Sequence, residues 1–140
     1  MKDYGSVRLQ TVEGTGLHFE ARFASGQAAT FDSGAAAVGP NPVEHLIGAL
    51  AACVGIDVIG ILRKRRLEVT GYEVVMSGKR AESPPKRFIA LELVHRVTGR
   101  GITAAAVEEA VRLSEDRYCS VLHTLDPALR RTRRIEIIEG

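Results

Sequence analysis

The sequence contains little cysteine and few aromatic side chains. Of its 140 residues, two are cysteine and none is tryptophan, while three are tyrosine and four are phenylalanine. The net charge of +2 and the shortage of stacking side chains argue against a nucleic-acid partner. The basic clusters at 63–66 (RKRR) and 130–134 (RRTRR) are therefore interpreted as solvated faces. There is no C-x-x-C and no closely spaced histidine pair, so a zinc signature is missing.

Long hydrophobic runs are also scarce, with one borderline case at Leu46–Leu62. Its seventeen residues fall just short of the roughly 18 to 20 needed to cross a bilayer, and Asp57 lies inside it. No basic start followed by an apolar stretch and a cleavage site is visible at the N-terminus. We therefore expect a soluble, cytoplasmic protein without a membrane partner.

The composition that remains is that of an ordinary globular protein. Hydrophobic residues make up 45% and charged residues 26% of the chain. The sequence has no repeat, no low-complexity tract and no linker rich in proline and serine. We expect one domain over residues 1–140.

Hydrophobic periodicity predicts six strands and two helices. The expected strands are 6–12, 17–23, 28–31, 68–77, 87–98 and 134–138, and the expected helices are 42–66 and a segment from about 103 to Pro127 with a possible break near Tyr118. Turns are expected at 13–16 and 25–26. Because most connections are hairpins, the pattern predicts an α+β fold, with helices on one face of an antiparallel sheet.

The first predicted helix has a clear start and an unusual surface. Asn41 suits the N-cap, Pro42 the first helical position, and Glu44 the third position of a capping box. From residue 46 to residue 62, apolar side chains cover most of the circumference, which predicts burial on all sides. Either the second helix or a second subunit must cover the rest, and we favour a second subunit.

Cys53 and Cys119 leave several interpretations open. Cys53 would be the twelfth residue of its helix, too far from the first turn for the dipole to lower the pKa of its thiol. The two cysteines could be inert and buried, form a structural disulfide, or act as a reversible redox pair. A metal site is another alternative, with His123 one turn after Cys119 and further ligands from Cys53 and elsewhere.

The segments around both cysteines resemble one known family. "NPVEHLIGALAAC" with "GIDVIGILRK", and "AVRLSEDRYCSVLHTL" around Cys119, resemble the OsmC/Ohr family of osmotically induced and organic-hydroperoxide-resistance proteins, and are closer to its OsmC-like branch. The resemblance covers essentially the whole chain. It implies antiparallel sheets wrapped around a long central buried helix and a second, cysteine-bearing helix, in an intertwined homodimer with active sites at the subunit interface.

The resemblance also implies a thiol-dependent peroxidase that reduces organic hydroperoxides in oxidative stress defence. Cys53 would attack the O–O bond and become a sulfenic acid, and Cys119 would resolve it by forming a disulfide. An external dithiol, with a lipoyl group as one candidate, would reduce that disulfide. The resemblance implies neither a cofactor nor a metal.

The family has two further site residues, an acidic residue and an arginine, and this chain matches them only in part. Its acidic residue matches Glu44, which on a straight helix lies about 180° around and about 13 Å from Cys53. Glu44 must therefore act from the partner subunit or through other groups. Where the Ohr branch has an arginine that stabilises the thiolate, this chain has Leu17, which leaves Arg22 as the candidate. Asp57, one turn beyond Cys53, is interpreted as structural.

The missing hairpin arginine also favours an alternative function. The protein would then be a non-catalytic dimeric module, whose apolar pocket beside Cys53 binds a small hydrophobic ligand.

Overall fold

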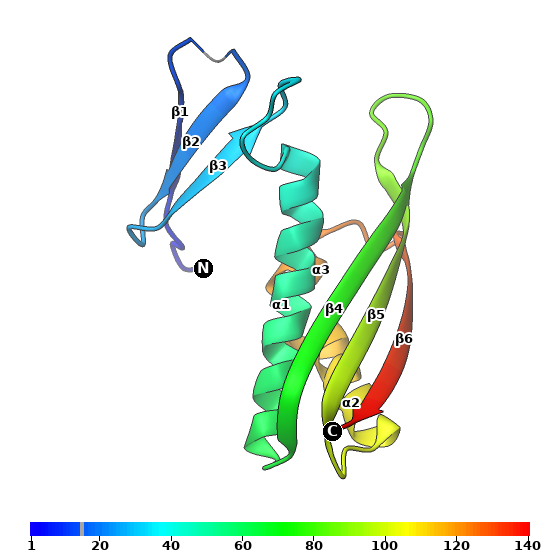
Figure 1. Ribbon diagram of the computed structural model, residues 1–140. Coiled ribbons are helices and arrows are strands. Elements are labelled where there is room, and N and C mark those ends of the chain that lie inside the picture. Colours follow the sequence, from blue (N-terminus) through cyan, green and yellow to red (C-terminus); the bar gives the residue numbers. More distant parts are fainter. Residues whose placement is uncertain (15) are drawn as a thin grey trace. The chain divides into compact units, whose positions relative to one another are not determined.

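The computed structural model describes residues 1–14 and 16–140 (Figure 1). The chain forms two compact units, Met1–Ile47 and Gly48–Gly140, which are described separately. Helix α1 (Pro42–Lys64) begins in the first unit and continues in the second.

The first unit is built around an antiparallel sheet of three strands in the order β1-β2-β3. Its strands are β1 (Val7–Thr11), β2 (His18–Phe23) and β3 (Ala28–Asp32). All three were predicted, β1 and β2 from alternating side chains and β3 as the short strand after the turn at 25–26. The turn predicted at 25–26 is present, with Gly26 at φ +90°, a backbone conformation that glycine adopts without strain. Thr15, in the turn predicted at 13–16, lies outside the described residues.

The loop between β3 and α1 is held by hydrogen bonds to side chains. Asp32 is buried, and its two carboxylate oxygens accept the backbone N–H groups of Gly34 at 2.8 Å and Val38 at 3.1 Å. At the start of α1, the backbone N–H of Glu44 donates to the Asn41 side chain at 2.8 Å, and the Glu44 carboxylate accepts the Asn41 N–H at 3.2 Å. This reciprocal pair confirms the predicted capping box.

The second unit contains the remainder of α1 and a sheet in the order β4-β5-β6. Strands β4 (Glu68–Arg80) and β5 (Phe88–Arg100) pair antiparallel, and β6 (Arg130–Glu139) pairs parallel with β5. The α+β class is confirmed, and the parallel pairing of β6 is a departure from the expected antiparallel arrangement. The helical segment between β5 and β6 forms a crossover, which brings β6 back in the same direction as β5.

The second predicted helix is divided into three pieces. It consists of α2 (Ala104–Leu113), a π-helical turn η1 (Ser114–Tyr118) and α3 (Ser120–Thr124). The hydroxyl of Thr103 caps α2 by accepting the N–H of Ala106 at 3.2 Å. The break expected near Tyr118 coincides with the π-turn, a form of helix often found at functional sites.

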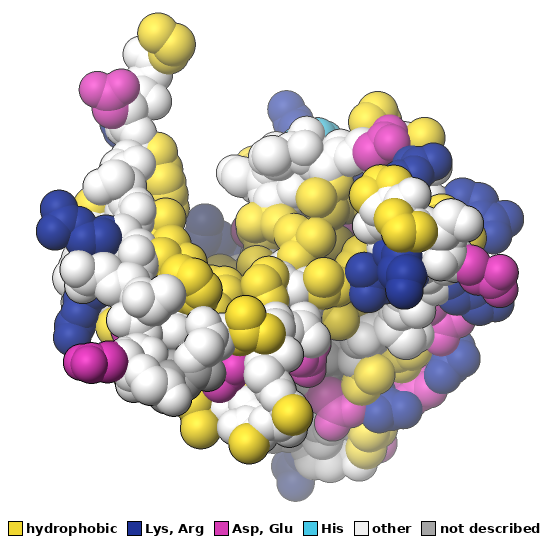
Figure 2. Space-filling view, turned by 90° about the horizontal axis from the view of Figure 1, so that it is seen from above, with side chains coloured by type: hydrophobic (Ala, Val, Ile, Leu, Met, Phe, Trp, Pro, Cys, Tyr) yellow, Lys and Arg dark blue, Asp and Glu magenta, His cyan; other side chains and the backbone are white. Residues whose placement is uncertain are grey.

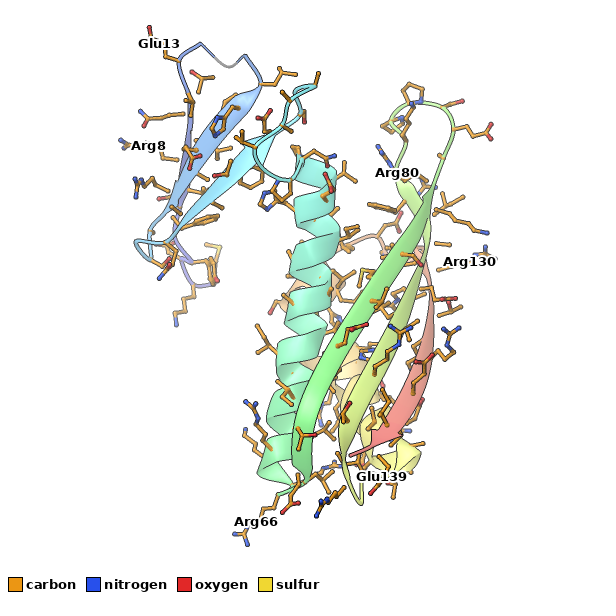
Figure 3. The ribbon with its side chains drawn as sticks, in the orientation of Figure 1. Arg8, Glu13, Arg66, Arg80, Arg130 and Glu139 are labelled. Atoms are coloured by element: carbon orange, nitrogen blue, oxygen red, sulfur yellow. The ribbon has the colours of Figure 1, made fainter. Side chains whose placement is uncertain are left out.

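One stripe of α1 forms part of the core of the second unit. Leu50, Val54, Val58 and Leu62 recur every fourth residue and are at most 1% exposed. The helix ends two residues before the predicted position, because Arg66 (Figure 3) takes a left-handed conformation with φ 59°. Burial of each such side chain contributes about 1.5 to 3 kcal/mol, so this stripe fixes α1 in the unit.

The side of α1 opposite this stripe is not fully covered by the described residues. Ile56, which lies about 180° around the helix from the centre of the stripe, is 69% exposed, so the second helical segment does not bury the helix on all sides. Exposed apolar side chains are also visible among the charged ones in Figure 2. By length and composition alone, α1 could cross a membrane, a property that core helices of soluble proteins share.

Candidate functional site

Cys53 lies in the third turn of α1, beside the buried stripe. It is half-buried and its thiol is free. Its immediate neighbour Val54 is part of the core, so packing fixes the rotation of the helix at this point. The helix begins at Pro42, which confirms that Cys53 is too far along it to benefit from the dipole of the first turn.

Cys119 is the fully buried residue between η1 and α3. Its sulfur accepts the backbone N–H of Leu122 at 3.3 Å, so the thiol serves as the N-cap of α3. Burial, with a smaller contribution from the neighbouring Cys53 side chain, raises the pKa of the Cys119 thiol to about 11, against the opposing effect of the Leu122 N–H. Cys53 and Cys119 are therefore neighbours, and both thiols are free.

Asp57 and Ser114 form a second link between α1 and the cysteine-bearing segment. The hydroxyl of Ser114 donates to the Asp57 carboxylate at 2.7 Å, and Ser114 is completely buried. The Asp57 charge is one of the smaller causes that raise the pKa of Cys119. The expectation that Asp57 needs a polar partner holds, although the partner is a serine rather than a cap or a basic residue.

The other two candidate residues belong to the first unit, whereas both cysteines belong to the second. Glu44 is exposed and takes part in the capping box. Arg22 is exposed on β2, in register with Arg8 on β1 (Figure 3). Leu17 is exposed as well. Within one unit, only Cys53 and Cys119 are brought together, so the roles of Glu44 and Arg22 stay predictions.

The metal alternative finds no support in the described part of the chain. Among residues 1–14 and 16–140, no group of three or more histidine, cysteine, aspartate or glutamate side chains could hold a metal ion. His123 is exposed, and its Nε2 lies 2.8 Å from the carbonyl oxygen of Glu115. One ring nitrogen of His123 is therefore already paired with a backbone carbonyl, and the residue is exposed whereas Cys119 is buried.

The basic cluster at 130–134 is partly neutralised by carboxylates. Arg133 pairs with Glu108 at 2.7 Å and with Glu115 at 2.6 Å. Arg130, at the start of β6, is labelled in Figure 3. Ion pairing of this kind is consistent with the interpretation of the cluster as a solvated face.

A buried polar pair in the sheet was not anticipated from the sequence. Nδ1 of His95 on β5 lies 2.7 Å from the hydroxyl of Tyr72 on β4. Burial lowers the pKa of His95 to about 4 and raises the pKa of Tyr72. Leu93, His95 and Val97 are at every second position of β5, so their side chains point to the same, core-facing side. This spacing is the feature of the sequence from which burial of His95 could have been predicted.

An apolar groove lies between α1 and β4, the edge strand of the second sheet. Its volume is about 490 Å³, and its lining includes Ala51, Gly55 and Ile59 of α1 with Tyr72 and Val74 of β4. Cys53 is not among its lining residues. The groove is therefore distinct from the cysteine pair.

Comparisons with known proteins agree with this fold. The family model described as OsmC-like protein matches residues 32–132. Protein YhfA of Escherichia coli K12 is 37% identical over 132 residues, which cover 94% of this chain and 97% of YhfA. A hypothetical protein from Aquifex aeolicus has a similar structure, with a TM-score of 0.87, 29% identity and 99% of each chain covered.

A more distant structure has the same fold. It is an organic hydroperoxide resistance protein OsmC from Legionella pneumophila, with a TM-score of 0.65 and 12% identity over 96% of this chain and 97% of that one. At this identity the likeness shows the fold alone. Since the family model covers more than half of the chain and YhfA is similar along nearly all of it, this protein belongs to the OsmC-like family.

Proposed function

We propose that the protein is a cysteine-based peroxidase that reduces organic hydroperoxides. The observation that carries the proposal is the interaction between Cys53 and Cys119, two free thiols that lie 66 residues apart in the sequence. Two buried cysteines that served only as small apolar side chains would not need to meet. A pair that meets in the reduced state can form and break a disulfide.

The difference between the two thiols assigns their roles. With a pKa of about 11, Cys119 is almost entirely protonated at neutral pH, and it is fully buried. Cys53 is half-buried on the surface of α1 and is the more accessible of the two. Because an attacking cysteine must be reachable by the substrate, the proposal gives the peroxidatic role to Cys53 and the resolving role to the buried Cys119.

The chemical steps balance with a hydroperoxide and a dithiol. The Cys53 thiolate attacks the terminal oxygen, the O–O bond breaks, and the S–OH group of a sulfenic acid forms; the alkoxide takes the proton that the Cys53 thiol released and leaves as an alcohol. Cys119 then attacks the sulfur of the sulfenic acid, a disulfide forms, and water leaves with the Cys119 proton. An external dithiol, with a lipoyl group as one candidate, reduces the disulfide, and no cofactor takes part.

The comparisons support a redox role for this family. Structures of the same fold include proteins described as organic hydroperoxide resistance proteins, from Legionella pneumophila and from Bacillus subtilis. A thiol pair that forms a transient, catalytic disulfide suits a reducing compartment, so we place the protein in the cytoplasm, where it would act in oxidative stress defence.

We further propose that the chain acts as a single domain, residues 1–140, in a homodimer. The exposed side of α1, which carries Ile56, is an apolar surface that a second copy would cover. In such a dimer, Glu44 and Arg22 of one subunit are the candidates to assist Cys53 of the other, Glu44 as the acidic residue and Arg22 as the cation that stabilises the thiolate.

A turnover assay tests the proposal. Consumption of cumene hydroperoxide is measured with dihydrolipoamide as reductant, beside hydrogen peroxide, for the wild type, Cys53→Ser and Cys119→Ser. We expect turnover that prefers the organic substrate, is abolished in Cys53→Ser, and stops after one equivalent in Cys119→Ser. Equal rates for the wild type and Cys53→Ser would contradict the proposal.

The groove between α1 and β4 favours a second candidate function. A non-catalytic dimeric module would bind a small hydrophobic ligand there, although the groove does not include Cys53. Under this alternative, neither cysteine reacts with hydroperoxide in the folded protein. The turnover assay with the wild type alone distinguishes the two functions.

A further inference from the structure

Ser114 connects the two cysteine-bearing segments through two hydrogen bonds. Its hydroxyl donates to the Asp57 carboxylate on α1 at 2.7 Å. Its carbonyl oxygen accepts the backbone N–H of Cys119 at 2.8 Å. One completely buried residue thus ties the helix that carries Cys53 to the backbone of Cys119.

The π-turn is what allows Ser114 to make both contacts. In an α-helix, a carbonyl accepts the N–H four residues later, but in η1 the Ser114 carbonyl reaches Cys119, five residues on. The extra residue ends the helix at Cys119, which takes an extended conformation and caps α3 through its sulfur. The position of the Cys119 thiol is therefore set by η1 on one side and by α3 on the other.

Asp57 is the matching anchor on α1. It lies four residues after Cys53, so the two side chains project from the same face of the helix about one turn apart. A hydrogen bond to a carboxylate is shorter and stronger than one between neutral groups, and the 2.7 Å distance fits such a bond. The contacts from α1 through Asp57 and Ser114 to Cys119 therefore form a second connection between the two segments that carry the thiols.

We propose that Asp57 and Ser114 are positioning residues that hold Cys119 where it can attack an oxidised Cys53. This inference rests on the proposed function and concerns its second step, in which the new S–S bond forms and the S–O bond of the sulfenic acid breaks. Disulfide geometry is narrow, with Cα atoms about 4.4 to 6.8 Å apart, so a small displacement of η1 slows closure. The first step, attack of Cys53 on the hydroperoxide, does not involve the pair.

The test separates the two steps in single turnover. Ser114→Ala removes the hydroxyl that Asp57 accepts, Asp57→Asn removes the charge, and Ser120→Ala, at an exposed serine next to Cys119, is the matched control. After mixing with cumene hydroperoxide, samples are quenched with dimedone and the sulfenic acid and disulfide are followed by mass spectrometry. We expect the disulfide to form about 10- to 100-fold more slowly in Ser114→Ala, with unchanged sulfenic acid formation and wild-type rates in Ser120→Ala.

A purely structural role would give a different pattern. Loss of stability alone would slow both sulfenic acid formation and disulfide formation. Sulfenic acid formation would then also be slower when Ser114→Ala is made in a Cys119→Ser background. Under the positioning role, Ser114→Ala has no effect on sulfenic acid formation in that background. Equal slowing of both steps, or an unchanged rate of disulfide formation in Ser114→Ala, would overturn the inference.

Oxidation by diamide distinguishes this inference from the proposed function. Diamide joins two thiols without a peroxidatic step, so closure of the Cys53–Cys119 bond can be timed even in a protein that does not react with hydroperoxide. We expect Ser114→Ala to slow this closure by a similar factor. An absence of hydroperoxide chemistry with slowed diamide closure would refute the peroxidase alone, whereas unaltered diamide closure would refute the positioning role.

Discussion

His95 is a fully buried histidine whose environment excludes the charged form. Its Nδ1 is hydrogen-bonded to the Tyr72 hydroxyl, and its Nε2 has no hydrogen-bond partner among the described residues. Burial, with a smaller contribution from the Arg133 guanidinium, lowers the pKa of His95 to about 4, and Glu108 opposes this effect. We therefore expect the folded protein to lose stability in mild acid through this one side chain.

The magnitude follows from the two pKa values. An unfolded histidine has a pKa of 6.5 and binds a proton well before the folded one, with its pKa of about 4, does so. The contribution of His95 to stability is therefore complete above pH 6.5 and is lost as the pH falls towards 4. The whole effect is about 3 kcal/mol, of which about 2 kcal/mol is lost between pH 7 and pH 5.

Urea unfolding at several pH values, at one fixed protein concentration, measures this loss. His95→Gln removes the titration and keeps a polar side chain near Tyr72, and His123→Gln, at an exposed histidine, is the control. Between pH 7 and pH 5, the wild type and His123→Gln should lose about 2 kcal/mol more than His95→Gln. The same pH dependence in the wild type and His95→Gln would refute the reasoning.

Three further predictions concern the site and the exposed helix face. Asp57→Asn, made in a Cys53→Ser background, should lower the pKa of Cys119, because a negative charge that disfavours the thiolate is removed. The absorbance of the thiolate, followed against pH, measures the shift, and an unchanged or higher pKa of Cys119 would contradict this prediction. Glu44→Gln should keep the capping box, with stability within about 0.5 kcal/mol by thermal unfolding, yet slow peroxide turnover; unchanged turnover would remove Glu44 from the site. Ile56→Glu should raise the dimer dissociation constant at least about tenfold in sedimentation, whereas a wild type that sediments as a monomer at micromolar concentration would refute the dimer.

Much of the fold could be predicted from local patterns. The capping box at Asn41 and Glu44 located the start of α1, because cap residues have specific hydrogen-bonding roles. Alternating side chains located the strands to within a few residues. The parallel pairing of β6 could not be predicted in this way, because periodicity describes a strand and not its partner.

The site was predicted less completely than the fold. The two cysteines were identified, and their meeting was expected from the family resemblance. Ser114 was missed because a serine within a helical pattern carries no signal of its own, and the π-turn that gives it a second role arises from tertiary packing. For Glu44 and Arg22, the resemblance supplies a role that a single chain does not test.

The central claim is that Cys53 is oxidised first and Cys119 closes the disulfide. It is tested most directly by adding one equivalent of cumene hydroperoxide to the reduced wild type and to Cys119→Ser, and by mapping the products with dimedone and peptide mass spectrometry. We predict a Cys53–Cys119 disulfide in the wild type, and a trapped sulfenic acid on Cys53 in Cys119→Ser. A sulfenic acid that appears first on Cys119, or two thiols that stay reduced until the protein unfolds, would contradict the account.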